Sequence, residues 1–141
     1  MLVFVYGTLT DPERAEAVLG RASGVGGPTP GEGIEYEYLG EATVEGLRRI
    51  EGEYPTLVPG GSVEGRLLWT TPQGIERLDA YEGVDRGLYV RVPIPRESGG
   101  RVRTYVGDPD RLEVNADWPG EGPFRNRVLA TVDGGVTLHE S

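Results

Sequence analysis

Short runs of hydrophobic residues, many of them alternating with polar ones, recur along most of this chain, and such runs predict strands. The first run, Val3-Phe4-Val5-Tyr6, is β-branched and aromatic, as is typical of a strand buried on both faces. Alternation over residues 34–39 and 42–50 predicts two more strands, the second bent at Gly46. The other strands expected from this pattern are residues 63–69, 88–94, 101–106 and 136–138.

Two helices are predicted where a capping residue is followed by Pro, at Asp11-Pro12 and at Thr71-Pro72. The cap accepts a hydrogen bond from the first turn, and Pro suits the first helical position. Gly20 and Gly83 end these helices, so the second one covers residues 72–82. A third, shorter helix is expected over residues 125–130.

Glycine and proline separate these elements. Residues 24–33 and 54–61 are predicted to be irregular, and residues 98–100 to form a hairpin turn. Gly65, inside a strand, indicates either a bulge or a close backbone approach. About seven strands and a few short helices, mostly antiparallel, predict an α+β fold whose sheet is closed or nearly closed.

The 141 residues fit a single domain with a sizeable core. The net charge is −9, and all 14 basic residues are Arg. An acidic chain repels phosphate backbones and anionic membranes, so neither nucleic acid nor a membrane is an expected partner. A Lys-free acidic surface suits work at high salt, although a GC-rich genome would give the same bias. With no leader or apolar span in the sequence, we expect a cytoplasmic protein.

The residue inventory excludes several chemistries. There is no Cys for a thiolate or a disulfide, and no Lys for a Schiff base. The one histidine, His139, lies near the C-terminus, so a His-based triad or metal site is not expected. No cofactor and no metal are predicted. Carboxylates and hydroxyls must carry any chemistry.

The first strand runs directly into Gly7, followed by Thr8 and Leu9. Gly breaks a strand without steric cost and allows a ligand to approach the backbone closely. Such a loop can present several N–H groups to an oxygen atom. The alternative is that the segment is only a core strand and its turn.

The helix over residues 72–82 carries a carboxylate on its apolar face. Ile75, Leu78 and Glu82 are spaced to share one face, so Glu82 should point inward where the helix ends. It is either paired, with Arg91 as the obvious partner, or kept reactive by partial desolvation. The charges expected to be ordinary and solvated are Glu76, Arg77 and Asp79.

Three short segments carry a resemblance to a known family: Tyr6-Gly7-Thr8-Leu9, Leu78-Asp79-Ala80-Tyr81-Glu82-Gly83 and Tyr89-Val90-Arg91. In their order and spacing they resemble the gamma-glutamylcyclotransferase-like superfamily. That group includes plant AIG2-like proteins and gamma-glutamylamine cyclotransferase. Tyr54-Pro55 and Val63-Glu64-Gly65 fit the same pattern, so the resemblance covers residues 2 to 106, and the remaining tail lies outside it.

The resemblance implies a small mixed, mostly antiparallel β-barrel flanked by short helices. A cavity there would hold a gamma-glutamyl or 5-oxoproline group, with Glu82 as general acid and base. Cyclisation of the gamma-glutamyl amide would give 5-oxoproline and release an amine. The residues implied to bind substrate are Tyr6, Gly7, Thr8, Leu9, Tyr89 and Tyr105. Because Tyr89 and Tyr105 lie on strand faces opposite the apolar alternation, at least one of them could be exposed.

We therefore expect a gamma-glutamylcyclotransferase-like domain over residues 1–107 and a C-terminal extension over residues 108–141 packed on the same domain. Residues 118–123 should form a loop anchored by Trp118. The expected partner is a small gamma-glutamyl-type substrate, and the protein is expected to be a monomer or a weak dimer. Two alternatives stay open: a non-catalytic protein of this fold that binds an acyl or amino-acid-like molecule, and a structural protein in which Glu82 pairs with Arg91.

Overall fold

The structure is a computed structural model that describes residues 1–19, 35–50, 55–113, 116 and 118–140. Its strands are β1 (Leu2–Val5), β2 (Tyr36–Ile50), β3 (Thr56–Thr70), β4 (Tyr89–Pro95), β5 (Arg101–Gly107) and β6 (Thr137–Glu140). Its α-helices are α1 (Pro12–Leu19), α2 (Pro72–Glu82), α3 (Pro109–Leu112) and α4 (Phe124–Asp133). Short 3-10 turns lie at Thr8–Thr10 and Val84–Arg86.

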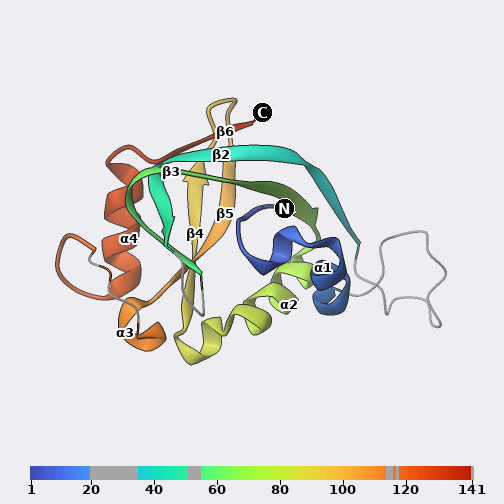
Figure 1. The fold of residues 1–141 in the computed structure, drawn as a ribbon, viewed down its shortest axis with the longest axis horizontal. Helices are drawn as coiled ribbons and strands as arrows, with labels where there is room; N and C mark the ends of the chain where they lie inside the picture. Colours follow the sequence, from blue (N-terminus) through green and yellow to red (C-terminus); the bar gives the residue numbers. More distant parts are fainter. Residues whose placement is uncertain (20–34, 51–54, 114–115, 117, 141) are drawn as a thin grey trace.

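The strands form one curled sheet in the order β4-β5-β1-β3-β2-β6 (Figure 1). β1 and β5 are parallel, and the other neighbours are antiparallel. The two edge strands meet at one end, where Arg96 bridges to Leu138 and the Glu97 N–H donates to the Leu138 carbonyl at 2.9 Å. This contact turns the sheet into a half-barrel. The predicted α+β class with a mostly antiparallel, nearly closed sheet is confirmed.

The long β2–β3 hairpin differs from the prediction. Residues 34–39 and 42–50 were expected to be two strands, but from Tyr36 onward they form the single strand β2. Residues 54–61 were expected to be irregular, but β3 already begins at Thr56. Register shifts between Tyr38 and Gly40 and between Glu45 and Leu47 absorb the irregular positions, so the pairing continues beyond them. The loop predicted for residues 24–33 lies outside the described residues.

The helix predictions are largely confirmed. In α2 the Thr71 hydroxyl accepts from the Gly74 N–H at 3.2 Å, and Gly83 ends the helix with φ 74°. α4 is longer than the predicted 125–130. α3 was not predicted, although Asp108-Pro109 repeats the cap-and-proline signal that marked the other two helices. None of the helices in the described ranges is long and apolar enough to cross a membrane.

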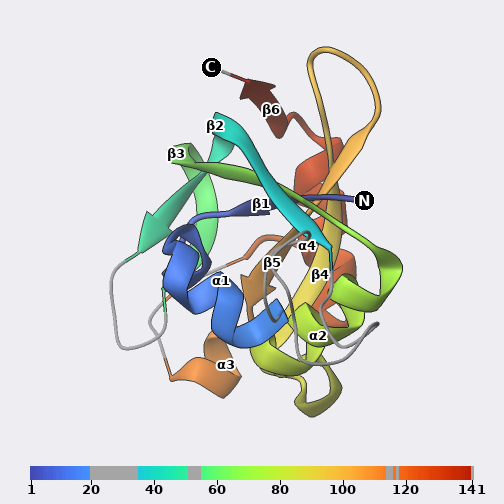
Figure 2. The same cartoon turned by 90° about the vertical axis from the view of Figure 1, so that its right-hand side faces the viewer.

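The sheet is covered on both faces, which explains the continuous apolar run of β1. Val3 and Val5 pack in a cluster with residues of α1 and α2, whereas Phe4 packs inside the curl with residues of α4. Figure 2 shows α1 and α2 together on one side of β1, with α4 beyond it. Trp118 is 4% exposed and packs edge-on against Phe124, as its predicted anchoring role requires. The domain boundary at residue 107 stays a prediction.

Candidate functional site

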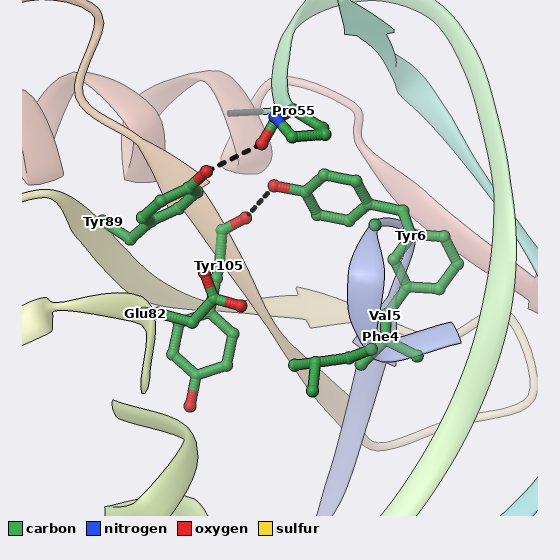
Figure 3. Close-up of a pocket in the computed structure, with 9 residues that line it drawn as sticks. Phe4, Val5, Tyr6, Pro55, Glu82, Tyr89 and Tyr105 are labelled. Carbon is green, nitrogen blue, oxygen red and sulfur yellow. Dashed lines mark hydrogen bonds between the residues drawn. The ribbon is translucent and has the colours of Figure 1, made fainter. Parts of the chain in front are cut away.

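A cavity of about 50 Å³ lies where β1 ends and where α2 ends. Figure 3 shows it in close-up. Its wall joins segments that are far apart in the sequence: the opening strand and loop, the residue before β3, the end of α2, and strands β4 and β5. The lining residues are Phe4, Val5, Tyr6, Gly7, Leu9, Pro55, Glu82, Tyr89 and Tyr105.

The loop that follows β1 is fixed by hydrogen bonds that its carbonyl groups accept. The Tyr6 carbonyl accepts from the Arg49 guanidinium at 2.7 Å, and the Gly7 carbonyl accepts from the Thr10 N–H at 3.1 Å and the Thr10 hydroxyl at 2.7 Å. Within the described part of the chain, no hydrogen bond donated by the Gly7 or Leu9 amide is found. These amides are therefore candidates for donation to a ligand, and that role stays a prediction.

The three tyrosines of the wall are fixed by hydrogen bonds from their hydroxyls. Tyr6 donates to the Tyr105 carbonyl at 2.5 Å, Tyr89 to the Pro55 carbonyl at 2.8 Å, and Tyr105 to Asp79 Oδ1 at 2.7 Å. Burial raises the pKa of Tyr6 and of Tyr105 well above the usual 10, so both phenols are neutral at pH 7. Tyr6 and Tyr105 therefore contribute neutral phenol groups to the wall.

The expectation that Tyr89 or Tyr105 could be exposed is wrong, since they are only 8% and 3% exposed. In β4 and β5 the apolar alternation fills the inside of the curl, while the opposite face is covered as well. Tyr89 and Tyr105 pack on that face in the cluster that contains Leu78 of α2. On these two strands the apolar alternation therefore distinguishes two faces that are both buried, and not a buried face from a solvent-exposed one.

Glu82 is the last residue of α2, and its carboxylate is directed into the cavity (Figure 3). Ile75 and Leu78 are buried on the same helix, as predicted. Burial raises the pKa of Glu82 from 4.5 to about 7. Neither a hydrogen bond nor an ion pair joins it to another described residue. At neutral pH this carboxyl group therefore exists in both protonation states.

Arg91, the partner that one of the two alternatives gave to Glu82, pairs elsewhere. Arg91 donates to Asp79 Oδ2 at 2.5 Å. The expectation that Asp79 is an ordinary solvated charge is thus wrong, because its carboxylate accepts from both Arg91 and Tyr105. The spacing from Ile75 to Asp79 is i, i+4, which places Asp79 at the border of the buried face and could have revealed it.

The structure brings most of the predicted site residues to one place. Tyr6, Gly7 and Leu9 from the first motif line the cavity together with Glu82 and the two strand tyrosines. Thr8 begins the 3-10 turn, and its side chain lies outside the described part of the chain. Phe4, Val5 and Pro55 were not predicted as lining residues. No group of three or more Asp, Glu or His side chains in the described ranges could hold a metal ion.

The family described as "Gamma-glutamyl cyclotransferase, AIG2-like" matches residues 3–123. The match therefore continues past residue 106, where the resemblance was expected to end. The long β2–β3 hairpin and the loop that carries Trp118 both fall within it.

Individual relatives agree with this match. AIG2-like protein A of Arabidopsis thaliana is 35% identical over 121 residues, covering 77% of this chain and 64% of that protein. At3g02910 of the same plant, named as a candidate gamma-glutamylcyclotransferase, is 32% identical over 90 residues, which are 55% of this chain and 46% of the relative. The chain thus spans less than two thirds of the length of these relatives.

The fold is also found in solved structures. The crystal structure of an AIG2-like protein from Mus musculus superposes with a TM-score of 0.57 at 21% identity, covering 86% of this chain and 90% of that one. At this identity the likeness concerns the fold alone. Because the family match covers residues 3–123, the chain belongs to the AIG2-like gamma-glutamyl cyclotransferase family.

Proposed function

We propose that this protein cyclises a gamma-glutamyl amide to 5-oxoproline and releases the amine, with Glu82 as general acid and base. The observation that supports this proposal most is the position of Glu82, desolvated in the wall of a cavity that also contains the Gly7 loop. A general base works best when its pKa lies near the operating pH, and the pKa of Glu82 is about 7. Family membership favours the same class of activity.

The proposed reaction needs few groups from the protein. The substrate's α-amine attacks its own γ-carbonyl carbon, a C–N bond forms to close a five-membered ring, and the amide C–N bond breaks. Glu82 takes one proton from the α-ammonium group, which frees the amine to attack. The second proton, lost by the ring nitrogen after closure, goes to the leaving nitrogen, and Glu82 then gives its own proton to the released amine, which departs as the ammonium ion. Because the nucleophile belongs to the substrate, orientation supplies much of the acceleration. The amides of Gly7 and Leu9 would hold substrate oxygens, and proton transfer adds roughly 10²–10⁴-fold.

The size of the cavity limits which part of the substrate it encloses. Its volume of about 50 Å³ is far below the ~300–1,000 Å³ of pockets that enclose a drug-sized ligand. We therefore infer that the cavity encloses no more than the glutamyl group, beside Glu82 and the tyrosine walls. The leaving amine would then lie outside the cavity, where fewer groups of the protein contact it.

The test is to incubate the protein with a panel of gamma-glutamyl amides and quantify both products. We expect 5-oxoproline and free amine to appear in equal amounts from at least one member of the panel. Binding of 5-oxoproline or of these amides without any product would contradict the catalytic proposal and support a ligand-binding protein. A raised melting temperature with ligand, measured in parallel, detects such binding.

A further inference from the structure

The carboxylate of Asp79 connects three elements that form the cavity. It lies on α2, one turn before Glu82. Its Oδ2 accepts from Arg91 on β4 at 2.5 Å, and its Oδ1 accepts from the Tyr105 hydroxyl on β5 at 2.7 Å. Arg91 and Tyr105 are direct partners in the β4–β5 ladder, so Asp79 binds both members of one cross-strand pair.

The same network continues into the cavity wall. The Tyr105 ring lines the cavity, and its carbonyl accepts from the Tyr6 hydroxyl at 2.5 Å. Tyr89 stands two residues before Arg91 on β4 and also lines the cavity. The pairing of Asp79 therefore fixes the helix end that carries Glu82 relative to the strands that carry the tyrosines. The Asp79 side chain is 24% exposed and does not line the cavity, so its influence on the site is indirect.

We propose that Asp79 is a positioning residue, whose bonds to Arg91 and Tyr105 hold the Glu82 carboxylate in register with the cavity wall. This inference rests on the proposed function of Glu82. Displacement of a catalytic group by about 1 Å can cost about 100-fold in rate. An Asp79→Asn variant keeps one acceptor oxygen where the carboxylate now offers two, one to Arg91 and one to the Tyr105 hydroxyl, so it can no longer accept from both. The connection between the helix end and the two strands should therefore loosen.

The substitution also changes the charge near Glu82. With Asp79 neutral, the Arg91 charge is no longer compensated, and a nearby positive charge favours the ionised form of a carboxyl group. The pKa of Glu82 should then fall. Arg91 is 33% exposed and can be solvated, so the variant is expected to fold.

The experiment compares the parent with three variants. Asp79→Asn removes the charge and one of the two acceptor oxygens, and Tyr105→Phe removes only the hydroxyl while the charge pair and the ring remain. Glu76→Gln, on the exposed side of the same helix, is the matched control for loss of one negative charge. The measurements are kcat, KM and their pH dependence with a gamma-glutamyl amide. A ¹³C NMR titration of the Glu82 carboxyl, assigned by its loss in Glu82→Gln, needs no turnover.

We expect Asp79→Asn to lower kcat about 10–100-fold with a smaller change in KM. The acid limb of its rate profile and the NMR titration of Glu82 should both move to lower pH. Tyr105→Phe should lower kcat without moving the titration, and Glu76→Gln should match the parent. If the titration of Glu82 and the rate are the same in Asp79→Asn as in Glu76→Gln, the positioning role is overturned. A parent without turnover contradicts the proposed function alone, and the NMR titrations of Asp79→Asn and Glu76→Gln then test whether Asp79 acts on Glu82.

Discussion

Arg91 donates to Asp79 at 2.5 Å, and this pairing removes the cation that was the obvious partner for Glu82. A carboxylate on the apolar face of a helix is either neutralised by an ion pair or perturbed by burial. In this chain the ion pair forms one helical turn before the cavity, and burial raises the pKa of Glu82 to about 7. The structural reading, in which Glu82 merely pairs with Arg91, is therefore not supported.

The raised pKa of Glu82 predicts an unusual pH dependence of stability. Between pH 4.5 and about pH 7, Glu82 binds more protons in the folded protein than in the unfolded chain. The free energy of unfolding should therefore fall as the pH rises through this range. The difference in pKa corresponds to about 3 kcal/mol. The Glu82→Gln variant has no ionisable group at this position, so it does not lose this stability as the pH rises. Urea unfolding of parent and variant should agree near pH 4 and diverge in favour of the variant by pH 8, whereas a pH-independent difference would contradict the assigned pKa.

Tyr6→Phe should destabilise the protein. It deletes the hydroxyl that donates to the Tyr105 carbonyl at 2.5 Å, and a buried carbonyl left without a partner typically costs about 1–3 kcal/mol. Tyr36→Phe is the matched control, because the Tyr36 hydroxyl donates no hydrogen bond to another described residue. Thermal melts should show a lower midpoint for Tyr6→Phe alone. Equal midpoints for the two variants would mean that the hydroxyl of Tyr6 is not a stabilising donor.

Gly65 shows the close backbone approach that was one of its two predicted roles. A Cβ atom at this position would lie 2.2 Å from the Val5 carbonyl oxygen and 2.8 Å from the Phe4 ring. Gly65→Ala should therefore push β3 away from β1 and cost about 1–3 kcal/mol, as overpacking of a core typically does. Ser62→Ala, at an exposed position of the same strand, is the control. A Gly65→Ala protein as stable as this control would show that the strands separate without cost.

The acidic composition predicts that salt stabilises the protein. With a net charge of −9 and no Lys, repulsion among carboxylates opposes the folded state. The screening length falls from about 10 Å at 0.1 M to about 3 Å at 1 M salt, so this repulsion should weaken. The melting midpoint is expected to rise with KCl over that range. A midpoint that stays flat or falls would show that surface repulsion is not a significant term.

The sequence predicted local structure well where a single residue type determines the backbone. Asp11-Pro12, Thr71-Pro72 and Gly83 fixed the limits of α1 and α2, because caps, Pro and left-handed Gly act within one turn. It failed for residues 56–61, where Pro59, Gly60 and Gly61 suggested a loop. Pairing with β2 on both sides of the two glycines overrides that local preference.

Most of the residues that line the cavity were named from the sequence, although their roles stay predictions, and the charge pairing beside the cavity was not predicted. Glu82 and the tyrosines were identified from helix periodicity and from the family resemblance. The partner of Arg91 was not identified, because Asp79 and Glu82 lie on the same helix. Only the course of β4 in the folded structure determines which of the two carboxylates Arg91 contacts. Side-chain pairing across distant elements depends on three-dimensional distances, which spacing along the chain does not give.

The central claim is that Glu82 transfers the proton, and one variant tests it most directly. Glu82→Gln keeps the volume of the side chain and loses its basicity, so the variant should fold, bind 5-oxoproline, and form product about 10²–10⁴-fold more slowly than the parent. The measurement is the rate of 5-oxoproline release by both proteins under saturating gamma-glutamyl amide, with binding measured on the same samples. A Glu82→Gln protein that melts normally and releases 5-oxoproline at the parent rate would contradict the assignment.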